Sequence, residues 1–145
     1  MQLTRYSDYS LRVLIYLAVR PDRLATIEEI AQAYEISKAH LMKVVHQLGR
    51  AGFLETVRGR GGGLRLARAP EDITVGDVIR YTEDKMELVE CFDPETSHCR
   101  IETVCGLRGV LEEALDAFLK TLDRYTLTDL VARRRKPLDR LFSAS

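Results

Sequence analysis

The fold of this chain is decided by residues 37–68, "SKAHLMKVVHQLGRAGFLETVRGRGGGLRLAR". The first half has the period of a helix, because apolar residues recur three and four positions apart. These residues are Leu41, Val44, Val45 and Leu48, and we expect them to face the core. Ser37 is placed to cap the start of this helix, and Gly49 and Gly52 mark its end. The opposite face carries Lys38, His40, Lys43 and Gln47.

The second half of the stretch predicts a small β-hairpin. Two short runs have the composition of strands, "FLETV" (53–57) and "LRLAR" (64–68), and "RGRGGG" (58–63) joins them. Leu64 and Leu66 alternate with Arg65, as in a strand with one buried face. The glycines permit a tight turn. The cations around this turn are Arg58, Arg60 and Arg65.

Two further helices are predicted before this stretch. The first covers about residues 7–19, with Ser7 as its cap. The second opens at a capping box formed by Thr26 and Glu29 and ends near Ala33. The fold class is therefore mainly α with a small β-wing, in the order of a winged helix-turn-helix. In this fold the third helix enters the major groove of DNA, and the wing lies along the backbone or in the minor groove.

The zero net charge conceals an uneven distribution. Residues 1–70 hold eleven Lys or Arg and six Asp or Glu, a net charge of +5, whereas residues 71–145 hold eleven and sixteen, a net charge of −5. Seven basic residues and one acid, Glu55, lie between Ser37 and Arg68. Such a basic region indicates a footprint for a polyanion. Together with the order of the elements, it favours double-stranded DNA as the partner.

The rest of the chain divides into three parts. "ITVGDVIRYTE" (73–83) predicts a helix with a second capping box, at Thr74 and Asp77, so the winged helix-turn-helix domain is expected to span residues 1–82. Residues 83–106 are loop-like and hold all three cysteines. Residues 107–136 are expected to form a long dimerisation helix and a C-terminal helix, and residues 137–145 a flexible tail.

The long helix has an apolar stripe between residues 107 and 125. It consists of Leu107, Leu111, Ala114, Leu115, Phe118, Leu122 and Tyr125. A helix of this size is roughly 30 Å long, and a small domain has little core left to cover it. Packing on its own domain is one outcome. We favour pairing with a second copy, because twofold symmetry suits the half-sites of a palindromic DNA operator.

The composition, 46% hydrophobic and 30% charged, is that of a globular protein. The longest apolar run, "LRVLIYLAV" (11–19), contains Arg12 and is too short to cross a bilayer. The first ten residues lack a signal-peptide core, so we expect a cytoplasmic protein, in which cysteines more often serve metals or redox chemistry than disulfides. An enzyme is not expected, since no Ser/His/Asp grouping stands out and "GRGGG" lacks the residues of a phosphate-binding loop.

Cys91, Cys99 and Cys105 have the spacing C-x7-C-x5-C. This is neither the paired C-x2-C of a zinc ribbon nor the C-x2-C-x2-C of a bacterial ferredoxin. The residues alone leave three uses open: an iron–sulfur cluster, a zinc site completed by His98, or a thiol switch without metal. A histidine beside Cys99 is also simply explained as an exposed loop side chain.

Several strings of the chain resemble those of one family. They are "LTRYSDYSLRVLIYLA" (3–18), "HLMKVVHQLGRAGFL" (40–54), "RGRGGGLRLAR" (58–68), "VECF" (89–92) and "YTLTDL" (125–130). On these strings the chain resembles the IscR/NsrR family of winged-helix iron–sulfur regulators, and within it the NsrR-type repressors that sense nitric oxide. The resemblance covers almost the whole chain. It implies that Cys91, Cys99 and Cys105 bind one iron–sulfur cluster, of the 4Fe-4S rather than the 2Fe-2S type.

The resemblance also bears on the fourth cluster ligand. IscR-type members use a histidine three residues after the third cysteine, where this chain has Arg108. NsrR-type members are understood to use an aspartate near the N-terminus, donated by the partner subunit, and Asp8 matches that position. From the residues alone, Asp8 is a first-turn carboxylate that favours the helix dipole and can pair with Arg12. The two roles are compatible, since Arg12 can orient Asp8 and couple it to the DNA-binding domain.

The implied function is a homodimeric transcriptional repressor in which nitrosylation of the cluster lowers the affinity for DNA. The residues expected to contact DNA are Ser37, Lys38, His40 and Lys43 on the third helix and Arg58, Arg60 and Arg65 on the wing. NsrR-type relatives often carry asparagine where this chain has Ala39, a departure that bears on base preference. The alternatives are a DNA-binding regulator with a different cluster, zinc or thiol signal, and an electron carrier, which would not need a basic head with a wing.

Overall fold

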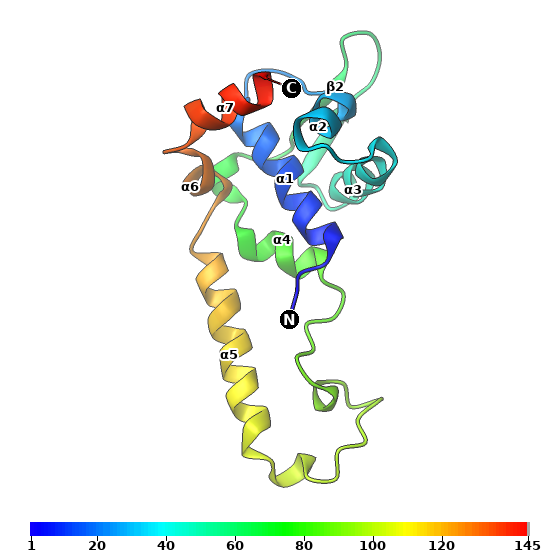
Figure 1. Cartoon of the computed structure of the whole chain (residues 1–145), viewed down its shortest axis with the longest axis vertical. Helices are drawn as coiled ribbons and strands as arrows, with labels where there is room; N and C mark the ends of the chain where they lie inside the picture. The colour runs from blue at the N-terminus through cyan, green and yellow to red at the C-terminus, as the bar shows by residue number, and fades with distance from the viewer. Residues whose placement is uncertain (145) are drawn as a thin grey trace.

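The structure is a computed structural model that describes residues 1–144. The helices are α1 (Arg5–Val19), α2 (Ile27–Tyr34), α3 (Lys38–Arg50), α4 (Val75–Thr82), α5 (Gly106–Asp123), α6 (Leu127–Val131) and α7 (Arg135–Ser143), and the strands are β1 (Leu54–Val57) and β2 (Gly63–Leu66). Figure 1 shows two parts. We call residues 1–82 and 124–144 the head, and residues 83–123, the loop and α5 that reach away from it, the extension. The predicted mainly α fold with a small β-wing is confirmed.

α1 is the central helix of the head. Its buried side chains include Val13, Leu14, Tyr16, Leu17 and Ala18, all at most 3% exposed. Around it pack α3, α4, α6, α7 and β2, which come from both ends of the sequence. The burial of α1 therefore fixes the positions of the elements that carry the predicted DNA contacts.

Threonine side chains cap the starts of α1, α2, α4 and α6. The two predicted capping boxes, Thr26 with Glu29 and Thr74 with Asp77, are confirmed. A third box, in which Thr126 and Asp129 open α6, was not predicted. All three capping boxes have the pattern T-x-x-[DE], and their side chains accept hydrogen bonds from backbone N–H groups that a helix start leaves free.

Of two predicted serine caps, one is wrong and the other is confirmed in position only. α1 begins at Arg5 and is capped by Thr4, whose hydroxyl accepts a hydrogen bond from the Ser7 amide at 3.2 Å. Ser7 instead lies in the first turn and is fully buried. Ser37 occupies the cap position of α3 but its side chain makes no capping hydrogen bond.

The wing is a two-stranded antiparallel hairpin with Leu54 opposite Leu66 and Val57 opposite Gly63. Leu64 is buried and Arg65 exposed, which confirms the predicted alternation. The turn requires glycine, since the Cβ of any other residue at position 62 would lie 2.2 Å from the carbonyl oxygen of Val57. Leu64 also exchanges two backbone hydrogen bonds with Ala25, at 2.7 and 3.0 Å, which joins the wing to the α1–α2 connection.

The extension contacts the head mainly where α5 packs on α4. Arg80 of α4 donates two hydrogen bonds to Asp123 at the end of α5, at 2.5 and 2.7 Å. Asp123 lies so close to Gly76 that a Cβ there would clash with its carboxylate. Within residues 1–144, no side chain of α5 is buried, and Leu107 and Val110 are 59% and 62% exposed. None of the helices in that range has the length and apolar character needed to span a bilayer.

The start of α1 is held to the end of α4 by a polar network. Glu83 accepts hydrogen bonds from the amide and hydroxyl of Thr4, at 2.7 and 3.0 Å, and from the hydroxyl of Ser7. The hydroxyls of Ser7 and Thr82 share a buried hydrogen bond of 2.7 Å. Partial burial raises the pKa of Glu83, but the hydrogen bonds from Ser7 and Thr4 outweigh it and hold that pKa below its ordinary value.

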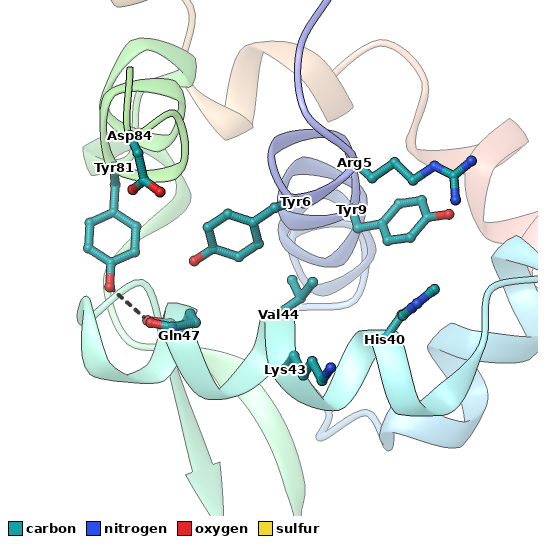
Figure 2. Close-up of a pocket in the computed structure, with 9 residues that line it drawn as sticks. All are labelled: Arg5, Tyr6, Tyr9, His40, Lys43, Val44, Gln47, Tyr81 and Asp84. Atoms are coloured by element: carbon teal, nitrogen blue, oxygen red, sulfur yellow. Dashed lines mark hydrogen bonds between the residues drawn. The ribbon is translucent and has the colours of Figure 1, made fainter. Parts of the chain in front are cut away.

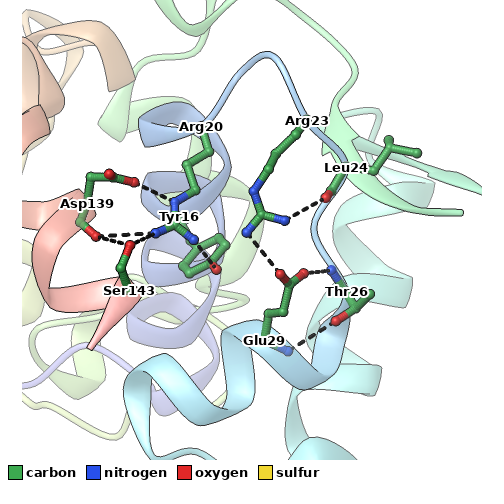
Figure 3. A network of polar contacts seen from close by, with 8 residues as sticks. All are labelled: Tyr16, Arg20, Arg23, Leu24, Thr26, Glu29, Asp139 and Ser143. Carbon is green, nitrogen blue, oxygen red and sulfur yellow. Dashed lines mark hydrogen bonds and ion pairs between the residues drawn. The ribbon is translucent and has the colours of Figure 1, made fainter. Parts of the chain in front are cut away.

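The C-terminal segment is not a flexible tail as predicted, because residues 135–143 form helix α7. Phe142 is 8% exposed, and its ring centroid lies 4.7 Å from that of Tyr16 and 5.3 Å from that of Tyr34. Arg20, which directly follows α1, binds Asp139 with an Nε–Oδ1 distance of 2.6 Å and also donates to the hydroxyl of Ser143 (Figure 3). Ser145, the last residue of the predicted tail, lies outside the described residues.

Phe142→Ala is expected to lower the free energy of unfolding by about 3–5 kcal/mol, because it empties a slot between two aromatic rings. Leu141→Ala is the matched control, since Leu141 is 68% exposed and its loss leaves no cavity. Urea denaturation followed by circular dichroism measures both. Equal unfolding midpoints for the two variants would mean that α7 does not pack on the head in solution.

Glu83→Gln is expected to destabilise the protein at neutral pH and to flatten its loss of stability in acid. Since the folded pKa of Glu83 is depressed, its contribution is present above the ordinary value of 4.5 and is lost as the pH falls through the folded value. Thermal unfolding midpoints between pH 3 and pH 7, on the order of one measurement per half unit, give the difference from wild type. Glu71→Gln, at an exposed residue, is the control. If both variants follow the same curve, the network does not stabilise the fold.

Candidate functional site

The predicted recognition residues of α3 fall into two groups. Lys38 is paired with Glu28 of α2, with an Nζ–Oε2 distance of 2.6 Å, so part of its charge is already compensated. His40 and Lys43 are exposed and make no hydrogen bond or ion pair within residues 1–144. They lie on the side of α3 that faces the start of α1 (Figure 2). These two side chains are therefore available to an external anion.

The outward surface of α3 also includes side chains that were not predicted as contacts. Ala39, Met42 and His46 recur three and four positions apart and are all exposed, with Met42 54% exposed. The same helical spacing that identified the buried stripe identifies this one. Apolar groups such as the Met42 side chain suit contacts with the methyl group of thymine.

The wing presents two uncompensated cations. Arg58 and Arg60 lie in the exposed turn and form no ion pair within the described part of the chain. Arg65 differs, because it stands opposite Glu55 in the hairpin and forms an ion pair with it. The sequence predicts all three arginines as cations of the wing. In the structure only the two at the turn, Arg58 and Arg60, have no acidic partner within residues 1–144.

The three cysteines lie in the extension and are free thiols. Cys91 is buried at 7% exposure in a single turn of helix, Glu90–Phe92, whereas Cys99 and Cys105 are partly exposed. Cys105 occupies the cap position of α5. Figure 1 places this loop and the start of α5 at the end of the molecule opposite the wing. Residues 1–144 contain no assembled group of three or more metal-ligating side chains.

The three cysteines have the right chemistry for an iron–sulfur cluster, although their side chains are not gathered around one point in residues 1–144. Thiolate sulfur is the usual ligand of such clusters, and one loop carries three such donors without a disulfide between them. Arg108, at the position where IscR-type members have their histidine, binds Glu102 and Glu112 at 2.7 and 2.9 Å. The hydrogen bond that Arg108 donates to Glu112, with the charges of both acids, raises the pKa of Arg108, so it stays a cation. His98 is exposed and is not gathered with the cysteines.

Asp8 lies on α1 in the head, so the chain itself does not bring it to the cysteine loop. The predicted pairing with Arg12 is confirmed, because the Nε–Oδ1 and Nη2–Oδ2 distances are 3.0 and 2.8 Å. The Asp8 side chain is 47% exposed. Arg12 in turn lies 5.8 Å from the ring centroids of both Tyr9 and Tyr34. The carboxylate is thus oriented by its own chain and open to a second one.

Comparisons with known proteins agree with this arrangement. The profile of the Rrf2 family, described as "Iron-dependent Transcriptional regulator", matches residues 3–133. Over 135 residues the chain is 58% identical to the "HTH-type transcriptional regulator NsrR" of Bacillus subtilis (strain 168), and the match covers 92% of each protein. This confirms the predicted resemblance to NsrR-type regulators.

Two solved structures share the fold. CymR, described as the global cysteine regulator of B. subtilis, is 28% identical with a TM-score of 0.74, and the match covers 92% of this chain and 98% of that one. IscR of T. potens is 25% identical with a TM-score of 0.75, covering 92% of this chain and 88% of that one. These relatives are named as regulators and not as enzymes, and the chain belongs to the Rrf2 family of transcriptional regulators.

Proposed function

We propose that this protein is a homodimeric repressor that binds double-stranded DNA and carries an iron–sulfur cluster responsive to nitric oxide. The observation that carries the proposal is the separation of two chemistries in one chain. Unpaired cations lie on α3 and the wing of the head, and three free thiols lie on a single loop of the extension. A DNA-binding surface and a soft-metal site are therefore built on different parts of the same protein.

The DNA interface is formed by His40 and Lys43 of α3 and by Arg58 and Arg60 of the wing. Each cation that neutralises a phosphate releases a counterion, so Lys43, Arg58 and Arg60 contribute to an affinity that falls with salt, and His40 can hydrogen-bond to a phosphate. Lys38 and Arg65 contribute less, since each already has an acidic partner. Ser37, which is free of a capping role, can donate its hydroxyl to a phosphate.

The dimer is formed through α5. This helix exposes Leu107 and Val110 and buries none of its side chains within residues 1–144. Large apolar side chains grouped on one helix are seldom left in water, and a second copy of α5 would cover them. Two heads joined in this way present two copies of α3, as a palindromic operator requires.

Cys91, Cys99 and Cys105 hold the cluster, and Asp8 of the partner subunit supplies the fourth ligand. The cluster, which the resemblance indicates is 4Fe-4S, supplies iron to which nitric oxide can bind. A carboxylate is a harder ligand than a thiolate and so makes the weakest of the four bonds. Asp8 suits this role because its carboxylate is half-exposed and Arg12 keeps it oriented. Its ligation ties the head of one subunit to the extension of the other.

Anaerobically purified protein is expected to show a visible absorption band, bound iron and sulfide, and tight binding to an operator duplex. Titration with nitric oxide should bleach this band and weaken DNA binding in parallel, by about 5–150-fold for a typical allosteric coupling. The band is followed by absorption and the DNA by fluorescence anisotropy. A colourless protein that contains zinc or no metal, with the same DNA affinity under nitric oxide, would move the assignment to a zinc or thiol switch.

Asp8→Ala is expected to retain the cluster, because the three thiolates remain, but to weaken its coupling to DNA. In the wild type, nitric oxide should lower the DNA affinity by about 5–150-fold, the usual range for an allosteric coupling of about 1–3 kcal/mol. In the variant this factor should be several-fold smaller, near the low end of that range. Asp22→Ala, at an exposed acid beyond the other end of α1, is the control. Iron analysis and anisotropy measure both properties. Unchanged DNA affinity together with an unchanged nitric oxide response would exclude Asp8 as the coupling ligand.

A further inference from the structure

A hollow of about 610 Å³ lies between the start of α1, the side of α3 and the end of α4 (Figure 2). Three tyrosines line it: Tyr6 and Tyr9 from α1 and Tyr81 from α4. Val44 of α3 adds an apolar side chain between them. Aromatic walls of this kind bind flat apolar groups by stacking and edge contacts. The cysteines contribute nothing to this hollow.

The charge around the hollow is uneven. Arg5, His40 and Lys43 line it, and none of the three has a hydrogen-bond or ion-pair partner within residues 1–144. Asp84 is the one acid among the lining residues of that range. Figure 2 shows Arg5 and His40 beside Tyr9 at one end, with Asp84 and Tyr81 at the other. The end at Arg5 is therefore open to an anionic group, which could form charge-assisted hydrogen bonds there.

The hydroxyl of Tyr6 gives an independent indication of a missing partner. It is buried and has no hydrogen-bond partner in the described part of the chain. Burial, with Tyr81 and Asp84 nearby, raises the pKa of Tyr6 to about 12, so the hydroxyl keeps its proton at neutral pH. Buried hydroxyls are nearly always hydrogen-bonded, and one without a partner marks a place for an acceptor from outside the chain. Figure 2 shows this hydroxyl at the Tyr81 end of the hollow, so the acceptor it would bind is a second polar atom of a ligand and not the group held at Arg5.

We propose that this hollow binds a small aromatic anion, with its ring against the three tyrosines and its acid group at Arg5 and His40. A DNA phosphate would satisfy the cations but would leave the tyrosine walls empty, so a free small molecule fits the whole hollow better. His40 and Lys43 are shared with the DNA interface of the proposed function. The ligand and DNA therefore compete, and the protein has a second input that does not depend on its cysteines.

Anilinonaphthalene sulfonate is a suitable probe, since it joins an aromatic body to one anionic group and fluoresces in apolar sites. The full-length protein is expected to bind one probe per chain. Arg5→Gln should weaken this binding about tenfold through the loss of a charged hydrogen bond. Phenylnaphthylamine, which has the rings without the sulfonate, should bind the wild type and Arg5→Gln equally. These measurements need neither cluster nor DNA, so they stand even if the proposed function fails.

Two controls separate the hollow from other sites. Leu141→Ser removes an exposed apolar side chain of α7, outside both the hollow and the proposed dimer helix, and should leave probe binding unchanged. Naphthoate should displace the probe, whereas inorganic phosphate at the same concentration should not. No saturable binding, loss of binding in Leu141→Ser but not in Arg5→Gln, or equal displacement by phosphate would each overturn the site. An operator duplex should release the probe, and a complex that holds both would overturn the competition.

Discussion

The burial of α1 is the constraint on which the rest of the structure depends. Its apolar side chains fill the centre of the head, and α3, α4, α6, α7 and the wing are all placed against it. The first turns of the same helix carry the groups proposed for function, which are Asp8 with Arg12 and the hollow-lining Tyr6 and Tyr9. Because close-packed interiors transmit strain, a force on Asp8 acts on a rigid helix that contacts the recognition helix directly. The residues proposed for sensing and those proposed for DNA contact thus depend on one core helix.

Local patterns were enough to predict the four helices α1 to α4 and the wing. Three- and four-residue spacing located α1 and α3, Thr-x-x-Glu/Asp located two helix starts, and alternation around Arg65 located the wing. The errors came from contacts between residues far apart in the chain. Ser7 resembles a cap, yet its hydroxyl is used by Thr82 and Glu83, about 75 positions away. The polar segment that ends in Phe142 resembles a tail, because nothing near it shows that Tyr16 and Tyr34 form a slot for that ring.

The candidate site was predictable by residue type and not by geometry. Three cysteines on one loop indicate a soft metal from their chemistry, but a single chain leaves them ungathered and Asp8 on another part of the molecule. Likewise, the sequence lists the cations of α3 and the wing without showing that Glu28 and Glu55 pair with two of them. The tyrosine-lined hollow has no local signature, since Tyr6, Tyr9 and Tyr81 meet only after α1 and α4 pack together.

After α5 the chain returns to the head and adds the basic residues of its C-terminal part there. The molecule is therefore a strong electric dipole, with a basic head and an acidic extension. The extension, residues 83–123, carries four basic and eleven acidic side chains, whereas the remaining residues carry eighteen and eleven. Opposite net charges of seven units therefore lie at opposite ends of an elongated protein that is neutral as a whole. In the field of a polyanion such a molecule rotates before it touches, with the wing and α3 leading and the cysteine loop kept away from the phosphates. The distribution of charge thus orients the protein as it approaches the polyanion. Salt that screens the field removes this orientation.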